Sequence, residues 1–164
     1  MAVNLIIRKC EAEDKLAFIK LNLDFMKETM EENPYWKSLK IPTEEEMECV
    51  FGAALNMPER ITIFVCEVDG EVVGYANTWT VYSIWSRGRV LTIDDLYIAA
   101  LYRRNGFGEK LMAYLLEYAE QKGYRRVQLH AELTNERAHG LYRKLGFAEE
   151  ELMFFMKQIE SRDA

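Results

Sequence analysis

A short loop rich in glycine and arginine carries the clearest chemical signal in this sequence of 164 residues. Its members are Arg103, Arg104, Asn105, Gly106, Phe107 and Gly108. The loop follows an apolar, β-branched run at residues 90–98 and precedes a helical pattern that begins near Glu109. Backbone N–H groups in the first turn of a helix lack an intrahelical acceptor and lie at the positive end of the helix dipole. The glycines leave room for a close approach and the arginines add positive charge, so the segment predicts a phosphate-binding site.

Two adjacent aspartates, Asp94 and Asp95, interrupt the apolar run before this loop. Successive side chains of a strand point to opposite faces, so we expect the two carboxylates on opposite sides of a sheet. The same alternation predicts that Asp94 shares its face with Thr92, Leu96 and Ile98. A carboxylate at a strand end can bind a cation or accept a proton. In the alternative interpretation, both aspartates are structural groups held by backbone N–H groups or by an arginine.

Two common phosphate-binding motifs do not fit the loop. No Lys-Ser/Thr pair follows Gly108, which excludes a P-loop, and Leu111 stands where the dinucleotide motif needs its third glycine. The pattern R-x-x-G-x-G after an apolar strand instead resembles the GNAT superfamily of N-acetyltransferases. A second segment, N-E-R-A-H-G-L-Y-R-K-L-G-F at residues 135–147, also resembles this superfamily, and the resemblance covers residues 61–155. Residues 93–98, I-D-D-L-Y-I, resemble the I-E-D-L-Y-V of polyamine- and thialysine-type acetyltransferases.

The resemblance implies that acetyl-CoA is the co-substrate. Its pyrophosphate would lie on the backbone amides of residues 104–108, next to the charges of Arg103 and Arg104. Its pantetheine arm would lie beside the preceding strand like an added strand, with backbone groups of Leu96 and Ile98 as partners. A backbone amide of that strand would donate to the oxyanion that develops during acyl transfer. The resemblance also implies a homodimer.

The resemblance places Asp94 where related enzymes carry a glutamate. A lysine-like amine has a pKa of about 10.4 and is cationic at neutral pH, so acetyl transfer requires the removal of a proton. We therefore expect Asp94 to anchor or deprotonate the acceptor amine. Aspartate is one methylene shorter than glutamate, which favours transfer of the proton through a water molecule.

Asn135 and Tyr142 are seven residues apart, a spacing that places them on one face of a helix, about 10.5 Å apart. The resemblance implies that Asn135 binds the amide-bearing arm of the cofactor and that Tyr142 serves the departing thiolate. Proton transfer from a phenol of pKa about 10 to a thiolate whose acid has a pKa of about 8.5 is unfavourable in water. We therefore expect Tyr142 to donate a hydrogen bond that strengthens as the sulfur gains charge. In the alternative interpretation, Tyr142 packs in an apolar core with Ala138, Leu141 and Leu145.

Aromatic residues in predicted loops, Trp36, Tyr82 and Trp85, could flank an acceptor pocket and hold a cation against their rings. Packing beneath the loops is the alternative. Of the two histidines, His139 is expected to be inert on the exposed side of a helix. His130 lies on a predicted strand and could approach the site, although a surface or core histidine without a catalytic role is the favoured interpretation.

The composition limits the possible partners. Hydrophobic residues make up 49% of the chain and charged residues 29%, which is typical of one soluble globular domain over residues 1–164. The net charge of −6 argues against a nucleic-acid partner. No apolar run reaches membrane-spanning length and the N-terminus lacks a signal-peptide pattern, so we expect no membrane partner and a cytoplasmic location. The three cysteines, Cys10, Cys49 and Cys66, lack CxxC spacing, which argues against a metal site or a disulfide framework.

Hydrophobic periodicity and turn residues define the expected elements. Strands are expected at residues 4–9, 60–68, 71–81, 90–98 and 126–131, helices at 11–32, 43–57, 109–122 and 135–146, and one or two closing strands within 147–160. The order β-α-α-β-β-β-α-β-α-β-β indicates an α/β fold in which helices flank a central mixed, mostly antiparallel sheet. It agrees with the fold that the resemblance implies.

We therefore predict an acetyl-CoA-dependent N-acetyltransferase that acts on a primary amine, with a small molecule such as a polyamine or an amino acid as the acceptor. Two alternatives stay open at this point. The enzyme could acetylate protein N-termini or lysines, or the chain could be a CoA-binding module without rapid turnover.

Overall fold

A five-stranded sheet, with the strands in sequence order, forms the centre of the first part of the chain. Its strands are β1 (Leu5–Lys9), β2 (Ile61–Val68), β3 (Glu71–Ser83), β4 (Gly88–Ile98) and β5 (Arg126–Leu129). The first four pair antiparallel and β5 pairs parallel to β4, which confirms the predicted mixed, mostly antiparallel sheet. The predicted turn between β2 and β3 is formed by Asp69 and Gly70, both with positive φ, as a tight two-residue hairpin requires.

The structure, a computed structural model, describes residues 3–33, 36–38, 40–157 and 159. The chain divides into two compact units, Met1–His130 and Ala131–Ala164. The prediction of a single domain over residues 1–164 stays a prediction.

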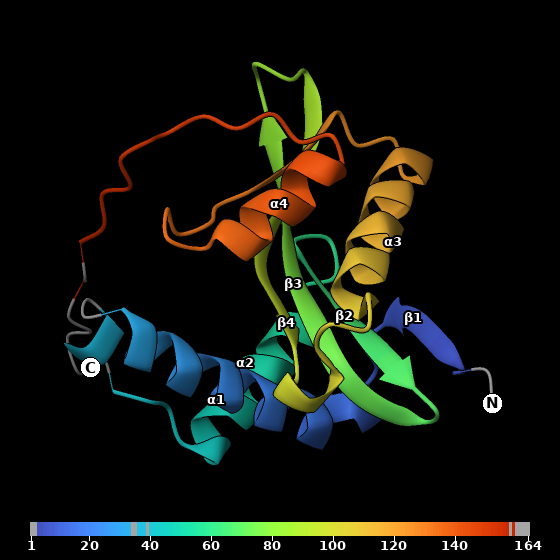
Figure 1. Cartoon of the computed structure of the whole chain (residues 1–164), viewed down its shortest axis with the longest axis vertical. Coiled ribbons are helices and arrows are strands. Elements are labelled where there is room, and N and C mark those ends of the chain that lie inside the picture. The colour runs from blue at the N-terminus through green and yellow to red at the C-terminus, as the bar shows by residue number, and fades with distance from the viewer. Residues whose placement is uncertain (1–2, 34–35, 39, 158, 160–164) are drawn as a thin grey trace. The chain divides into compact units, whose positions relative to one another are not determined.

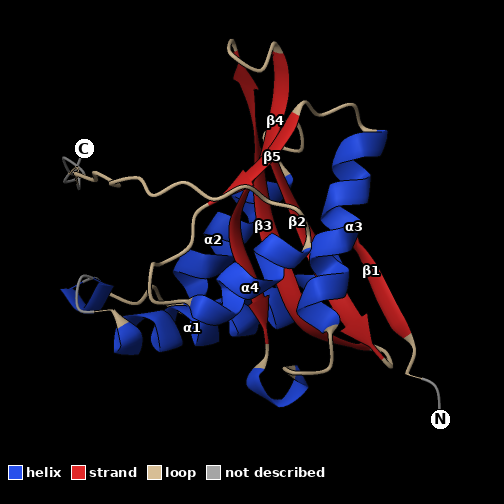
Figure 2. Cartoon of the chain, turned by 45° about the horizontal axis from the view of Figure 1, so that its top comes forward, coloured by secondary structure: helices blue, strands red, loops and turns tan. Residues whose placement is uncertain are grey.

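Three helices cover the sheet of the first unit, α1 (Lys15–Glu32), α2 (Glu44–Leu55) and α3 (Phe107–Gln121) (Figure 1). The alternation of side chains in β2 sorts them between the two faces. Ile63 and Val65 belong to the buried cluster that α1 and α2 share, whereas the ring of Phe64 packs edge-on against Tyr118 of α3, with the centroids 4.9 Å apart. Helices therefore lie on both faces of the sheet, as predicted (Figure 2).

The second unit contains a single helix among its described residues, α4 (Glu136–Lys144). The side chain of Asn135 caps it by accepting a hydrogen bond from the N–H of Ala138 at 3.1 Å. The predicted closing strands are not formed in the described part of residues 147–160. Residues 147–157 and 159 contain neither strand nor helix. Apolar side chains of this stretch, such as Phe154 and Phe155, are instead exposed.

Candidate active site

The glycine-arginine loop leads into α3 with its backbone N–H groups free. Within the part of the chain that the structure describes, the N–H groups of residues 104–108 have no hydrogen-bond acceptor, and the first bond of the helix joins the N–H of Lys110 to the carbonyl of Gly106. Gly106 caps the helix with a φ of 78°, which glycine adopts without strain, and Arg104 has a φ of 67°. Successive amides in such a turn can converge on an anion. The helix begins at Phe107, two residues before the predicted start.

The loop lies directly against the end of β4. A Cβ atom built on Gly108 would be 3.8 Å from Cγ1 of Ile98 and 3.9 Å from Cδ2 of Leu96, which is ordinary van der Waals contact. The side chain of Asn105 supports the turn by donating to the carbonyl oxygens of Tyr102 and Arg103, each at 3.2 Å. The structure thus brings the predicted phosphate loop together with the strand end that contains Leu96 and Ile98.

The backbone of β4 is unpaired on one side along this strand end. The ladder between β4 and β5 runs from Val90 to Ile93, which pairs with Leu129, and the shorter β5 then ends. Beyond that pair, no strand among the described residues bonds to residues 94–98 on this side. An extended chain with amide groups, such as a pantetheine arm, fits an edge of this kind as an added strand. The edge lies next to the free amides of the loop, so the residues present fit acetyl-CoA.

A β-bulge at Asp94 changes the geometry that simple alternation predicts. Asp95 pairs with Asn77 and Ile93 pairs with Thr78, so Asp94 is the extra residue of β4. Residues directly opposite in a sheet share a face, and the shift therefore places Thr92 on the face of Asp95 and away from Leu96 and Ile98. The predicted common face of Thr92, Leu96 and Ile98 is wrong for this reason. Asp94 itself is exposed, and its carboxylate has no partner among the described residues.

Asp95 lies on the face of the sheet that α1 and α2 cover. Its Oδ2 accepts a hydrogen bond from the amide of Asn77 at 2.8 Å. Burial raises the pKa of the Asp95 carboxyl, the hydrogen bond from Asn77 lowers it, and the charge of Asp94 raises it, for a net increase. The neighbouring Tyr75 is fully buried, and its hydroxyl accepts from Asn22 of α1 at 2.8 Å.

Arg103 differs from the expectation that both loop arginines face the phosphates. Its Nη2 donates to Glu28 of α1 at 2.6 Å and its Nε donates to the carbonyl of Ile98 at 2.7 Å. The guanidinium also lies over the ring of Tyr97, 5.1 Å from its centroid. Arg104 is exposed and forms no ion pair within the described residues, so it is the arginine whose charge is available to a ligand.

The second unit holds the other two predicted site residues. Asn135 is the N-cap of α4, so its side-chain oxygen is occupied. The ring of Tyr142 packs against Phe147, with the centroids 5.8 Å apart, and burial raises the pKa of its phenol. A phenol is protonated at neutral pH at its ordinary pKa of about 10, and the upward shift leaves the hydroxyl a hydrogen-bond donor.

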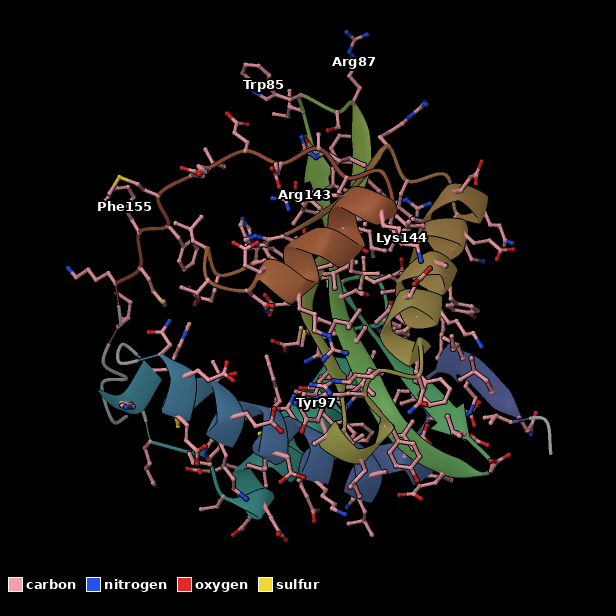
Figure 3. All side chains as sticks on the ribbon, viewed as in Figure 1. Trp85, Arg87, Tyr97, Arg143, Lys144 and Phe155 are labelled. Carbon is pink, nitrogen blue, oxygen red and sulfur yellow. The ribbon has the colours of Figure 1, made fainter. Side chains whose placement is uncertain are left out.

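The three aromatic residues that were predicted to flank an acceptor pocket have different surroundings. Trp85 lies at the tip of the long β3–β4 hairpin (Figure 3). Tyr82 lies near the end of β3. Their exposed fractions are 94% and 74%. Trp36 is half-buried in the short helix that follows α1. His139 lies with its Nε2 3.0 Å from the carbonyl oxygen of Glu132. Packing beneath a loop is therefore wrong for Trp85, whereas its role towards an acceptor stays a prediction.

Three residues that support the site were not found from the sequence. Asn77 and Glu28 contact Asp95 and Arg103 across long chain separations that carry no local signal. Gly74 lies opposite Ile98, and a Cβ atom there would collide with the Ile98 side chain and lie 2.7 Å from the Tyr97 carbonyl oxygen. A glycine inside a strand pattern marks such a close approach, so this signal was available.

No group of three or more His, Cys, Asp or Glu side chains that could hold a metal ion occurs among the described residues. Across the same residues, no helix has the length and apolar character needed to cross a membrane.

Comparisons with known proteins identify relatives of the chain. A family model described as Acetyltransferase (GNAT) family matches residues 23–147. An uncharacterized N-acetyltransferase of Bacillus subtilis, YhfO, is 30% identical over 103 residues, which are 63% of this chain and 68% of that protein. The thialysine N-epsilon-acetyltransferase of Bos taurus is 37% identical over 75 residues, 46% of this chain and 44% of that protein. The chain thus spans about two thirds of the first relative and less than half of the second.

Solved structures show the same fold. A possible acetyltransferase from Clostridium difficile 630 aligns with a TM-score of 0.79 and 22% identity, covering 95% of this chain and 98% of that one. An aminoglycoside acetyltransferase from a soil metagenome, solved with sisomicin, aligns with a TM-score of 0.74 and 24% identity over 95% and 97% of the two chains. An aminoglycoside N-acetyltransferase solved with CoA aligns with a TM-score of 0.76 and 16% identity over 97% and 98%.

Proposed function

Because the chain belongs to the acetyltransferase (GNAT) family and is an acyltransferase, we propose that it transfers an acetyl group from acetyl-CoA to the primary amine of a small molecule. The observation that carries this proposal is the continuity of residues 94–108. This one segment contains an exposed carboxylate at a bulge, an unpaired strand edge and a turn of free amides. These are the parts needed to remove a proton, hold an acyl thioester and bind a pyrophosphate.

Asp94 takes the role of general base or amine anchor. Asn77 occupies one oxygen of Asp95, whereas Asp94 is exposed and has no partner within the described residues. An amine of pKa about 10.4 must lose a proton before it attacks the thioester carbonyl, and a carboxylate can take that proton directly or through water. The free N–H groups along the edge of β4 are donors for the oxygen that gains charge during the attack.

Tyr142 takes the role of hydrogen-bond donor to the departing thiolate. Its raised pKa keeps its proton in place, which suits a donor and disfavours full transfer of the proton to sulfur. Asn135 would bind the amide-bearing arm of the cofactor through its side-chain nitrogen, since its oxygen caps α4.

A small-molecule acceptor is supported by the relatives whose names state a substrate. The thialysine enzyme acts on an amino-acid analogue, and the soil-metagenome enzyme was solved with an aminoglycoside. Both are compact amines, and the acceptor of this chain is proposed to belong to the same chemical class.

The test is the release of free thiol from acetyl-CoA across a panel of polyamines, lysine analogues, aminoglycosides, aryl amines and N-terminal peptides. We expect turnover with one class of small amine. In that reaction Asp94→Asn should lower kcat about 10²- to 10⁴-fold, the usual contribution of a general base. Tyr142→Phe should lower kcat roughly 10- to 100-fold, the value of a hydrogen bond to a charged atom.

Asp95→Asn is the matched control, because it removes a carboxylate from the same strand end and should leave kcat within about threefold. An Asp94→Asn, Tyr142→Phe double variant with full turnover would refute both roles. Turnover only with peptides would refute the small-molecule acceptor and indicate that the acceptor is a protein. Failure to bind acetyl-CoA at all in calorimetry would refute the proposed function.

A further inference from the structure

A polar cluster fastens the end of β4 to α1. Both carboxylate oxygens of Glu28 are used, because Oε1 accepts from the hydroxyl of Tyr97 at 2.8 Å and Oε2 accepts from Arg103 at 2.6 Å. Tyr97, on β4 beside α1 in Figure 3, lies under the guanidinium of Arg103. Glu28 and Arg103 are 75 positions apart in the sequence, so this contact joins the covering helix to the start of the phosphate loop.

Arg103 closes a second, local ring in the same cluster. Its Nε donates to the carbonyl of Ile98, five positions earlier, at 2.7 Å. The guanidinium therefore fixes both ends of the segment that leaves β4 and enters the loop. Immediately after it, Arg104 adopts a left-handed backbone conformation with a φ of 67°. A non-glycine residue in this region is strained and persists where surrounding contacts hold it.

The charge of Arg103 is neutralised by its ion pair with Glu28. The Arg103 and Glu28 side chains are only 32% and 37% exposed, and the carboxylate next to the guanidinium neutralises it locally. Arg103 thus contributes geometry to the loop, and the free amides and Arg104 remain to meet the phosphates.

We propose that Glu28 is a positioning residue for the acyl donor, which holds the phosphate loop in its binding conformation through Arg103. The inference rests on the proposed function, because it assumes that the loop binds the pyrophosphate of acetyl-CoA. Glu28 touches neither the acetyl group nor the acceptor in this assignment. Its removal should therefore weaken the binding of the phosphate-bearing part of the donor and leave the chemical step intact.

The experiment compares two acyl donors on the Glu28→Gln variant. Acetyl-CoA carries the pyrophosphate, whereas S-acetylpantetheine has the same thioester and arm without it. We expect the KM for acetyl-CoA to rise about tenfold with kcat within about twofold, while the KM for S-acetylpantetheine stays unchanged. The Kd of CoA measured by calorimetry should rise by the same factor, and this reading does not depend on an identified acceptor.

Two further variants make the result specific. Arg103→Lys keeps the charge but loses the planar fork that reaches both Glu28 and the Ile98 carbonyl, so it should show the same donor-selective effect. Glu32→Gln removes the same charge from an exposed position one turn further along α1 and should leave the KM for both donors unchanged. Thermal unfolding of each variant checks that the protein is folded at the assay temperature.

Equal losses with both donors would overturn the proposal, because they would show that Glu28 supports the fold or the chemical step. A rise confined to the KM of the acceptor would overturn it in favour of amine recognition. If the wild-type protein bound CoA but transferred no acetyl group, the proposed function would fail, and an unchanged Kd of CoA in Glu28→Gln would be the separate result that refutes the positioning role.

Discussion

Asp94 and Asp95 are neighbours in the sequence with opposite surroundings. The bulge leaves Asp94 exposed, whereas Asp95 lies under α1 and α2 with one oxygen bound to Asn77. A carboxylate that is partly buried without a cation beside it is destabilising when ionised, because desolvation disfavours the charged form. The raised pKa of Asp95 has this cause. The two residues therefore make separate predictions, Asp94 for turnover and Asp95 for stability.

Replacing Asp95 by asparagine should stabilise the folded protein at neutral pH. The folded-state pKa of Asp95 is raised above the unfolded value of about 3.9, so the folded state binds the proton more tightly. Its contribution to the free energy of unfolding is then full below pH 4 and decreases as the pH rises through the folded pKa. We expect Asp95→Asn to gain on the order of 1 kcal/mol at pH 7, with the hydrogen bond to Asn77 retained through the new amide oxygen.

Urea unfolding at pH 7 and at pH 3.5 measures this difference. The advantage of Asp95→Asn should disappear at the lower pH, where the wild-type carboxyl is largely protonated. Asp94→Asn is the control and should raise the free energy of unfolding at pH 7 by less than Asp95→Asn does, because its side chain is exposed and only its charge acts on Asp95. A destabilised Asp95→Asn protein at pH 7 would contradict the assignment of Asp95 as a carboxylate that desolvation makes destabilising.

At the scale of the elements, the sequence predicts which segments are helices and strands better than it predicts their contacts. The five strands and four α-helices of the described residues agree with the predicted ones to within a few residues, because turn residues such as Asp69-Gly70 are local signals. The buried face of α1 was less predictable. Leu16 fits the helical period but is 73% exposed, whereas Phe18 is buried against the ring of Tyr75.

The reason is that α1 carries apolar residues on more than one side, and the sheet selects which of them are buried. Val50 of α2 gives the same lesson, since it is 56% exposed beside the buried Phe51. The predicted closing strands failed for a related reason. An apolar run such as residues 152–156 is compatible with a strand, but a strand forms only when it pairs with another strand. The local sequence does not determine which strand that is. The bulge at Asp94 is likewise a property of the pairing with β3.

Gly74 tests whether the β3–β4 contact positions the cofactor edge. A Cβ atom at this position would lie 2.7 Å from the Tyr97 carbonyl oxygen, so Gly74→Ala must push the end of β4 away. We expect a loss of about 1–3 kcal/mol in the free energy of unfolding, as for other overpacked sites, together with weaker CoA binding. Chemical denaturation and calorimetry measure the two effects.

Gly52→Ala is the control for Gly74→Ala. Gly52 lies in α2, and a Cβ atom built there would meet nothing within 4 Å beyond its chain neighbours and the nearby backbone of its own helix. Alanine should therefore stabilise the helix by about 0.5–1 kcal/mol and leave CoA binding unchanged. If Gly74→Ala were as stable as Gly52→Ala and bound CoA normally, the close approach of β3 and β4 would not matter for the site.

At the scale of the whole molecule, the amino-terminal strand is tied to the first unit by ion pairs as well as by the sheet. Arg8 of β1 binds Asp14 at 2.7 Å and Glu67 of β2 at 3.0 Å. Asp14 is only 7% exposed, and it also accepts from the N–H of Glu11 at 2.8 Å. Hydrogen bonds from Arg8 lower the pKa of the Asp14 carboxyl, an effect that exceeds the rise caused by burial.

This cluster predicts how the first unit responds to acid. The folded-state pKa of Asp14 lies below its unfolded value of about 3.9, so its stabilising contribution is present above that pH and is lost as the pH falls through the folded pKa. Asp14→Asn should therefore be less stable than the wild type by about 1.5–3 kcal/mol at pH 7, the value of hydrogen bonds to a charged group, and the gap should narrow below pH 4. Glu48→Gln breaks the exposed Lys15–Glu48 pair and should lower stability by less than about 1 kcal/mol. Urea midpoints of the wild type and of the two variants, measured between pH 3 and pH 7, make the comparison. If the stability difference between the wild type and Asp14→Asn were small at pH 7, or the same at every pH, the Arg8 cluster would not stabilise the unit.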